Sequence, residues 1–248
     1  MSLTTAPSRV IWHHARVREA RLETPTARRI EFDIPTWPGN DAGAHVDVRL
    51  TAPDGYQAAR SYSIASAGAD KRVVIAVDEV PEGEVSPYLV RSLEVGDELE
   101  VRGPLGRFFV WLPSKESEPA PVQLIAGGSG IVPLFAMAAA HDRHYDGSKF
   151  RLLYSVRTSA DVYFRAELDA LAHASVDLNY TRESDDNDGN RPGRLTREKL
   201  SQLTLAPESR PRIFVCGPTS FVEAVSKWLV ELGHDPMTIR TERFGGLA

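Results

Sequence analysis

Polar and apolar residues alternate in short runs through the first half of the chain. Alternation with period two is typical of strands that bury one face. The runs predict strands over 15–23, 28–34, 45–51, 57–64, 73–80 and 97–102. Pro53-Asp54-Gly55 separates the third and fourth runs and is a hairpin turn signal. A short helix is expected over 88–93, with Ser86 as its cap and Pro87 in its first turn.

The second half has a different period, beyond a segment rich in proline and charge at 113–121. Strand-like apolar runs are found at 122–126, 151–156, 176–181, 212–216 and 237–241. Helical patterns alternate with them at 131–141, 161–173, 196–203 and 218–232. Asp161 is expected to cap the second helix, and the apolar face of the last contains Phe221, Val225, Trp228 and Leu232.

These periods predict a fold of two domains. Strands at the spacing of the first half favour a six-stranded antiparallel β-barrel, which we place over 8–112. Strand–helix alternation predicts an α/β domain with a parallel sheet covered on both faces. We place this second domain over 122–248, with 113–121 as the linker.

Composition narrows the possible functions. The 248 residues carry a formal net charge of −5 and include one cysteine, Cys216. One cysteine excludes an intramolecular disulfide and any all-cysteine zinc or iron–sulfur site, and no histidine spacing indicates a metal. The acidic balance argues against nucleic acid as a partner. Neither a signal peptide nor a membrane span is visible, so a cytoplasmic location without a membrane partner is expected.

A glycine-rich segment, Gly127-Gly-Ser-Gly-Ile-Val-Pro133, follows a buried strand and opens a helix. Glycines let the backbone approach a phosphate, and a helix N-terminus offers N–H groups that have no partner within the helix. The segment has neither the GxGxxG nor the P-loop pattern. A phosphate site and a plain strand–helix turn therefore remain equally open.

A second motif, Arg60-Ser61-Tyr62-Ser63, ends a barrel strand. The Arg60 guanidinium suits a phosphate oxygen, Tyr62 offers a flat ring and a hydroxyl, and Ser63 is a small donor and acceptor. Taken alone, an ordinary edge strand explains this motif better than a binding site does.

The two motifs occur in order with Gly83-Glu-Val-Ser86, Gly103-Pro-Leu-Gly106 and Cys216-Gly-Pro218. This series spans most of the chain and resembles the ferredoxin–NADP reductase superfamily. The resemblance implies an FAD-binding barrel, a nicotinamide-dinucleotide-binding domain and flavin-dependent NAD(P)H oxidoreductase activity. Glu84 stands where the family has a second glycine, so the phosphate grip is expected to rely on the Ser86 hydroxyl.

The resemblance also implies roles for the barrel residues that match its motifs. Arg60 would neutralise the FAD pyrophosphate, Tyr62 would pack on the isoalloxazine, and Ser63 would hydrogen-bond near flavin N5. Other cofactor-binding positions in the barrel would be Ser61, Val77, Glu79, Gly83, Val85 and Ser86.

In the second domain, the resemblance places Gly128, Gly130 and Ile131 at the pyrophosphate of the nicotinamide dinucleotide. Cys216 and Pro218 would lie near the nicotinamide. Glu242 would be the C-terminal acid, and Phe244 would cover the other flavin face. Ser63, Cys216 and Glu242 are thus the catalytic candidates. A filler role for Cys216, a core role for Phe244 and a solvated Glu242 remain open.

The nucleotide preference depends on the strand end that contains Ser155 and Arg157. No acid is present there, and arginine accommodates a 2′-phosphate. Arg182, at the next strand end, would assist, so NADPH is expected over NADH. Two alternatives remain for Arg157: it is an exposed cation without a ligand, or its side chain stacks on the adenine ring.

A chain with one cysteine has no iron–sulfur cluster of its own, so we expect a separate electron acceptor, such as ferredoxin or an oxygenase component. Two other functions remain open. One is an NAD(P)H:flavin reductase that uses free flavin as substrate. The other is a non-catalytic flavin-binding regulatory module.

Overall fold

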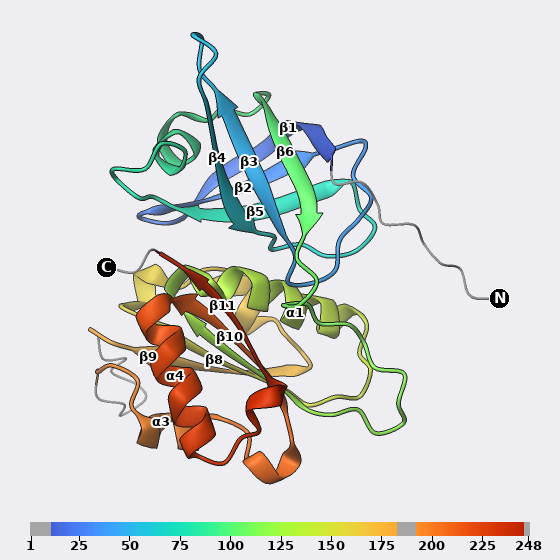
Figure 1. Cartoon of the computed structure of the whole chain (residues 1–248), viewed down its shortest axis with the longest axis vertical. Helices are drawn as coiled ribbons and strands as arrows, with labels where there is room; N and C mark the ends of the chain where they lie inside the picture. Colours follow the sequence, from blue (N-terminus) through green and yellow to red (C-terminus); the bar gives the residue numbers. More distant parts are fainter. Residues whose placement is uncertain (1–10, 183–191, 246–248) are drawn as a thin grey trace, which may run out of the picture.

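The alternating first half forms a six-stranded antiparallel sheet in the order β4-β3-β6-β1-β2-β5. The computed structural model describes residues 11–182 and 192–245, and Figure 1 shows this sheet above a second one. A bridge between Ile64 and Ile75 joins the two edges of the first sheet into a barrel. Its strands are β1 (Ile11–Thr24), β2 (Ala27–Asp33), β3 (His45–Thr51), β4 (Gln57–Ser63), β5 (Arg72–Asp78) and β6 (Glu98–Leu105).

The second half forms a parallel sheet in the order β11-β10-β7-β8-β9, which confirms the expected fold class. Its strands are β7 (Val122–Gly127), β8 (Phe150–Val156), β9 (Ala174–Tyr180), β10 (Arg212–Pro218) and β11 (Ile239–Phe244). The α-helices are α1 (Ile131–Arg143), α2 (Arg165–Asp169), α3 (Arg197–Leu203) and α4 (Thr219–Glu231). No described helix is long and apolar enough to cross a bilayer.

Helix α1 lies between the parallel sheet and the barrel (Figure 1). Every residue from Ile131 to Ala138 is buried, because one side of the helix packs on the sheet and the other meets barrel residues such as Ala42 and Ala76. A helix that is apolar on all faces is typical of this position. The same cluster of buried residues therefore spans both domains.

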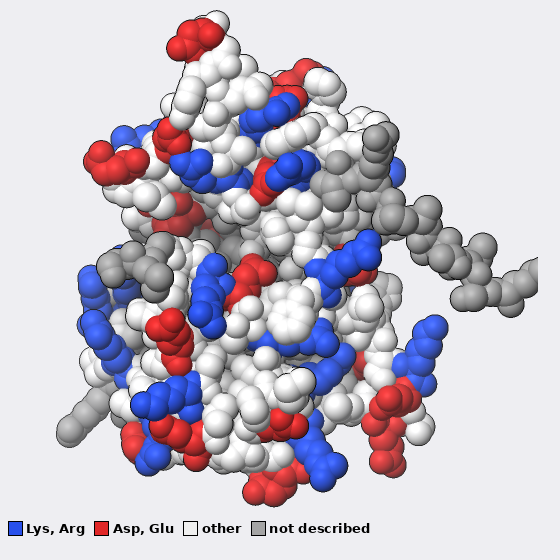
Figure 2. All heavy atoms as spheres, in the orientation of Figure 1, with Lys and Arg blue, Asp and Glu red and all other residues white. Residues whose placement is uncertain are grey.

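Helices α3 and α4 cover the opposite face of the parallel sheet. The buried residues of α4 are Val222, Val225 and Leu229. The predicted face does pack on this core: Val225 is fully buried, and Phe221, Trp228 and Leu232 are partly buried and pack against the cluster, while Val222 and Leu229 are its further buried residues. Figure 2 shows acidic and basic side chains interspersed over both domains, and exposed pairs of this kind contribute little stability.

The predicted cap of the short barrel helix is wrong. This helix is a short π-helix, η1 (Tyr88–Ser92), and no side chain caps it. The Ser86 hydroxyl instead accepts a hydrogen bond of 3.0 Å from the Val80 N–H. It therefore satisfies the backbone of the preceding turn rather than that of the helix.

The predicted helix over 161–173 is also wrong. Asp161 ends a 3₁₀ turn, η3 (Ser159–Asp161), and closes a capping box with Thr158. The only α-helix in this segment is the five-residue α2, because Phe164 just before it has a left-handed φ of 56°. That conformation is held by contacts with the barrel, which no local pattern encodes.

Gly130 provides a test of the packing between α1 and β10. A Cβ at this position would lie 2.3 Å from the Cys216 carbonyl oxygen. Gly130→Ala is expected to destabilise the fold by about 1–3 kcal/mol or more, and to lower Tm by at least about 2–4 °C. Gly193→Ala is the control, because no atom lies within 4 Å of its added Cβ. Equal Tm values for the two variants in thermal unfolding would contradict this packing.

Candidate functional site

The three catalytic candidates come together where the two domains meet. Ser63, the last residue of β4, donates a hydrogen bond of 2.9 Å to Oε1 of Glu242 on β11. Glu242 pairs in register with Cys216 on the neighbouring parallel strand β10. Residues far apart in sequence are therefore adjacent, and the Ser63–Glu242 hydrogen bond is one of those that connect the barrel with the second domain.

Burial determines the electrostatics of this cluster. Burial raises the pKa of the Glu242 carboxyl, while the Ser63 hydrogen bond and His45 oppose that shift. Burial also raises the pKa of the Cys216 thiol, and the charge of Glu242 adds to the shift. Cys216 is therefore a neutral thiol in a buried wall rather than a nucleophile. Phe244 is 39% exposed, which argues against a core role for this ring.

Arg60 and Tyr62 share one face of β4. Burial raises the pKa of Tyr62 to about 12. Arg60 is exposed and forms an ion pair with Glu84, which also accepts a hydrogen bond of 2.6 Å from the Tyr56 hydroxyl. The cation expected at a pyrophosphate thus already has a carboxylate partner, contributed by the residue that departs from the family motif.

The other predicted cofactor-binding residues of the barrel differ in how far their side chains are free to contact a ligand. Ser61 lies on the opposite face of β4 and donates to Asp47 at 2.5 Å, so the structure does not bring it to Arg60 and Tyr62. The side chains of Val77 and Val85 belong to the barrel core, which leaves only their backbone atoms for a ligand. Glu79 forms an ion pair with Arg91. The Gly83 N–H donates to the Val80 carbonyl at 2.8 Å.

A cleft of about 370 Å³ lies at the carboxyl edge of the parallel sheet, where ligands bind in sheets of this type. Its lining includes the predicted residues Gly128, Ser155, Arg157, Pro218 and Phe244. Gly130 and Ile131 are buried and do not line it. The exposed Arg182 lies beside Arg157, to whose carbonyl its N–H donates at 2.9 Å.

Sequence reasoning missed the barrel side of this cleft. Thr24, Thr26 and Asp78 line it from the barrel, and Asp161 and Tyr163 line it from the second domain. Burial raises the pKa of Asp78, opposed by a hydrogen bond from Thr26 and by the charge of Arg157. Asp161 is an acid in the same cleft as Arg157, although none occurs at the strand end itself. Thr24, Thr26 and Asp78 reach the cleft only because the two domains dock.

The site residues fit the two groups that the motifs imply. On the flavin side, Arg60 and Tyr62 offer a cation and an aromatic ring on one face of β4. A cleft of about 720 Å³ within the barrel adjoins Arg60 through the ion-paired Glu84, but none of the predicted FAD-binding residues lines it. At the dinucleotide cleft, Gly128 has a φ of +54° and open space where a Cβ would be, so a ligand can approach its backbone. The described residues contain no group of His, Cys, Asp and Glu that could hold a metal.

Comparisons with known proteins agree with this division. Residues 14–110 match the oxidoreductase FAD-binding domain model, and residues 124–227 match the oxidoreductase NAD-binding domain model. The glycine betaine monooxygenase reductase subunit of Chromohalobacter salexigens is 34% identical over 77% of this chain and 53% of its own length. The 2-halobenzoate 1,2-dioxygenase electron transfer component of Burkholderia cepacia is 29% identical over 82% of this chain and 58% of its own length. The chain thus spans little more than half of these relatives.

Among solved structures, the FAD/NAD-binding domain of nitric oxide dioxygenase from Vibrio cholerae matches with a TM-score of 0.82 and 25% identity, over 94% of this chain and 99% of that one. The Neisseria gonorrhoeae ferredoxin NADP⁺ reductase has the same fold, with a TM-score of 0.77 and 20% identity over 94% of this chain and 98% of that one. The two domain models, in this order and on this fold, show that the chain belongs to the ferredoxin–NADP reductase superfamily of FAD- and NAD-binding oxidoreductases.

Proposed function

We propose that this chain is an FAD-dependent NAD(P)H oxidoreductase that takes hydride from NADPH, or from NADH, and passes electrons to a separate acceptor protein such as ferredoxin or an oxygenase component. The hydrogen bond between Ser63 and Glu242 carries this proposal, because it sets the two candidate groups for hydride transfer at the junction of the FAD-binding and NAD-binding domains. Relatives named as a reductase subunit or an electron transfer component of oxygenases support a separate acceptor.

Bound FAD supplies the redox chemistry, since it accepts a hydride and releases electrons one or two at a time. The role of the chain is to bind the FAD and the nicotinamide nucleotide, to orient them toward each other, and to exclude water from between them. Ser63 is held by Glu242 at the end of β4, so its hydroxyl has a fixed position. The neutral, buried Cys216 adds no charge to the wall beside it. Phe244 supplies an exposed ring two residues beyond Glu242 on the same strand face.

The ion pair of Glu84 with Arg60 favours one alternative function, that of a flavin reductase that uses free flavin as substrate. The Glu84 carboxylate pairs with Arg60 and so competes with a pyrophosphate for that cation. Weaker binding of the adenylate half of FAD is expected of an enzyme whose flavin binds and dissociates as a substrate. The strength of FAD binding therefore distinguishes the two functions.

Anaerobic stopped-flow mixing with NADPH and NADH tests the proposed function. The purified yellow protein is expected to lose its flavin absorbance with both nucleotides, and faster with NADPH because Arg157 pairs with the 2′-phosphate. Arg157→Ala is expected to reduce the NADPH advantage by about tenfold, and Arg182→Ala by less. Equal rates, or a faster reaction with NADH, would overturn the NADPH preference. No bleaching by either nucleotide would support a regulatory module.

A steady-state comparison of ferredoxin, cytochrome and free flavin as acceptors then tests the separate acceptor. Turnover with ferredoxin well above that with free FMN supports the proposal. The reverse order, in a protein purified without colour, supports the flavin reductase.

Substitutions of the Arg60–Glu84 pair test the flavin grip. Glu84→Gln removes the competing charge and is expected to lower the Kd for FAD by about 3- to 10-fold, whereas Arg60→Gln should raise it about tenfold or more. Titration with flavin fluorescence as the signal measures both values. Weaker FAD binding by Glu84→Gln would show that Glu84 itself contacts the cofactor.

Glu242 predicts a pH-dependent stability. Its pKa in the folded protein is above the usual value of 4.5, so folding favours the protonated form. The stability linked to this group is full below the unfolded pKa and is lost as pH rises through the folded pKa. Glu242→Gln is uncharged and avoids that loss, so its Tm relative to wild type should increase with pH across this window. The control is the exposed Glu223→Gln, and parallel Tm curves for all three FAD-loaded proteins would contradict the prediction.

A further inference from the structure

Tyr163 lines the dinucleotide cleft, and its hydroxyl has no hydrogen-bond partner among the residues that the structure describes. The residue is 4% exposed, so water does not satisfy this group. Burial raises the pKa of the hydroxyl, and the charge of Asp78 adds to the shift, so the group keeps its proton and is a donor. A buried donor without an acceptor costs free energy and needs an explanation. A ligand in the cleft would supply the missing acceptor.

The backbone beside Tyr163 is held in a rare conformation. Phe164 has a φ of 56°, and strained aromatic residues of this kind persist only where the surroundings fix them. The Phe164 N–H donates to the carboxylate of Glu23, which belongs to the barrel strand β1. Its ring stacks on Phe135 of α1, with ring centroids 4.2 Å apart. The Tyr163 N–H donates to the Tyr154 hydroxyl at 3.4 Å.

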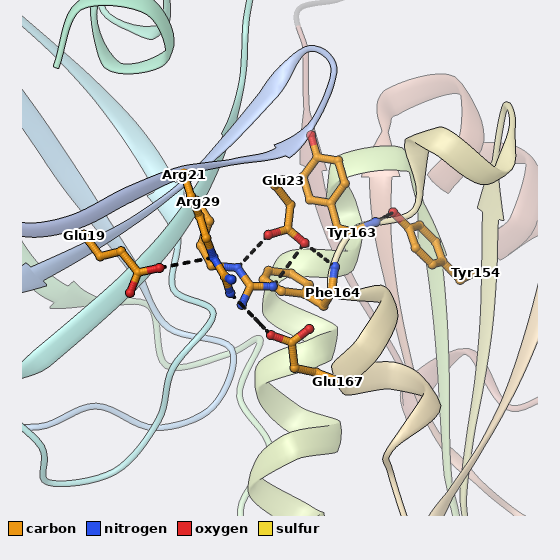
Figure 3. A network of polar contacts seen from close by, with 8 residues as sticks. All are labelled: Glu19, Arg21, Glu23, Arg29, Tyr154, Tyr163, Phe164 and Glu167. Carbon is orange, nitrogen blue, oxygen red and sulfur yellow. Dashed lines mark hydrogen bonds and ion pairs between the residues drawn. The ribbon is translucent and has the colours of Figure 1, made fainter. Parts of the chain in front are cut away.

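Arg29 of β2 completes an interdomain clamp made of Glu23, Arg29, Phe164 and Glu167. Its guanidinium donates to both oxygens of Glu23, at 2.6 and 3.0 Å, and to Glu167 at 2.5 Å. The guanidinium carbon also lies 4.5 Å from the centroid of the Phe164 ring. In Figure 3, Phe164 lies toward Arg29 while Tyr163 projects away from it, toward the β1–β2 hairpin. Groups of both domains therefore determine where Tyr163 lies.

The groups around the Tyr163 hydroxyl favour a sugar over a phosphate. Arg157 lines the same cleft and is the proposed partner of the 2′-phosphate, but the lining charges that act on the Tyr163 hydroxyl are those of Asp78 and Asp161. Carboxylates repel a phosphate but accept hydrogen bonds from sugar hydroxyls. On the basis of the proposed function, we propose that Tyr163 donates a hydrogen bond to a ribose hydroxyl oxygen of the nicotinamide dinucleotide, and that the interdomain clamp positions it.

Tyr163→Phe in the FAD-loaded full chain tests the contact, because it removes only the hydroxyl. The Kd for NADPH, obtained from the concentration dependence of flavin bleaching, is expected to rise about 3- to 10-fold. The limiting bleaching rate should stay within about twofold, since the bond orients no reacting atom. Tyr145→Phe is the control, because Tyr145 is exposed and stacks on His173 outside the cleft. An unchanged Kd, or an equal rise in the control, overturns the contact.

Arg29→Lys tests the clamp, with Arg49→Lys as a matched control. Arg49 also bonds both oxygens of one carboxylate, Glu100, and lies over an aromatic ring, Trp12, but within the barrel. Both variants lose a guanidinium fork, and only Arg29→Lys is expected to raise the Kd for NADPH, by a few-fold. The flavin spectrum should not change in either protein.

A double variant separates positioning from general stability. Because Arg29 acts through Tyr163, Arg29→Lys combined with Tyr163→Phe should raise the Kd no more than Tyr163→Phe alone. If the double variant raises the Kd for NADPH by the product of the two single effects, the positioning role of Arg29 is overturned. An equal rise of the Kd in Arg49→Lys overturns it as well. If Arg29→Lys fails to fold, Tyr163→Phe still decides the contact. A wild-type flavin that neither NADPH nor NADH bleaches would instead contradict the proposed function.

Discussion

The site depends on the burial of α1 between the parallel sheet and the barrel. This helix has no polar face along Ile131–Ala138, so neither domain alone would shield it from water. The shared core fixes how the domains meet, so the Ser63–Glu242 bond and the dinucleotide cleft, which both domains line, depend on that packing. Gly130, at the start of α1, permits the close approach to Cys216 that the packing requires.

Polar contacts add direction to this apolar interface. The Ser63–Glu242 hydrogen bond connects β4 with β11, and the interdomain clamp connects β1 and β2 with the segment around Phe164. Apolar packing is tolerant of small sliding motions, whereas a bidentate arginine pair with a stacked ring allows little of it. These polar contacts, together with hydrogen bonds from Arg143 to the Ala67 carbonyl and from Arg240 to the Phe108 and Val110 carbonyls, therefore set the orientation that burial alone leaves loose.

Charge placement distinguishes the two halves of the proposed site. On the flavin side, Glu84 already partners the cation expected at the pyrophosphate. In the dinucleotide cleft, Arg157 shares the space with Asp78 and Asp161. The sequence singled out Arg60, Arg157 and Glu84, but it did not reveal that Glu84 pairs with Arg60. It also did not reveal that Asp78 of the barrel and Asp161 of a 3₁₀ turn share the cleft with Arg157.

The sequence by itself determined the strands, their parallel or antiparallel class and the family, because side-chain periodicity and glycine spacing are local properties. It also indicated Ser63, Cys216 and Glu242, which the structure brings together, and their catalytic roles stay a prediction. Only the tertiary structure decided that Ser86 satisfies a turn, that the expected helix over 161–173 breaks at Phe164, and that the barrel contributes Asp78 to the dinucleotide cleft. The physical reason is the same in each case: the partner that determines the conformation is distant in sequence, so no local pattern contains it.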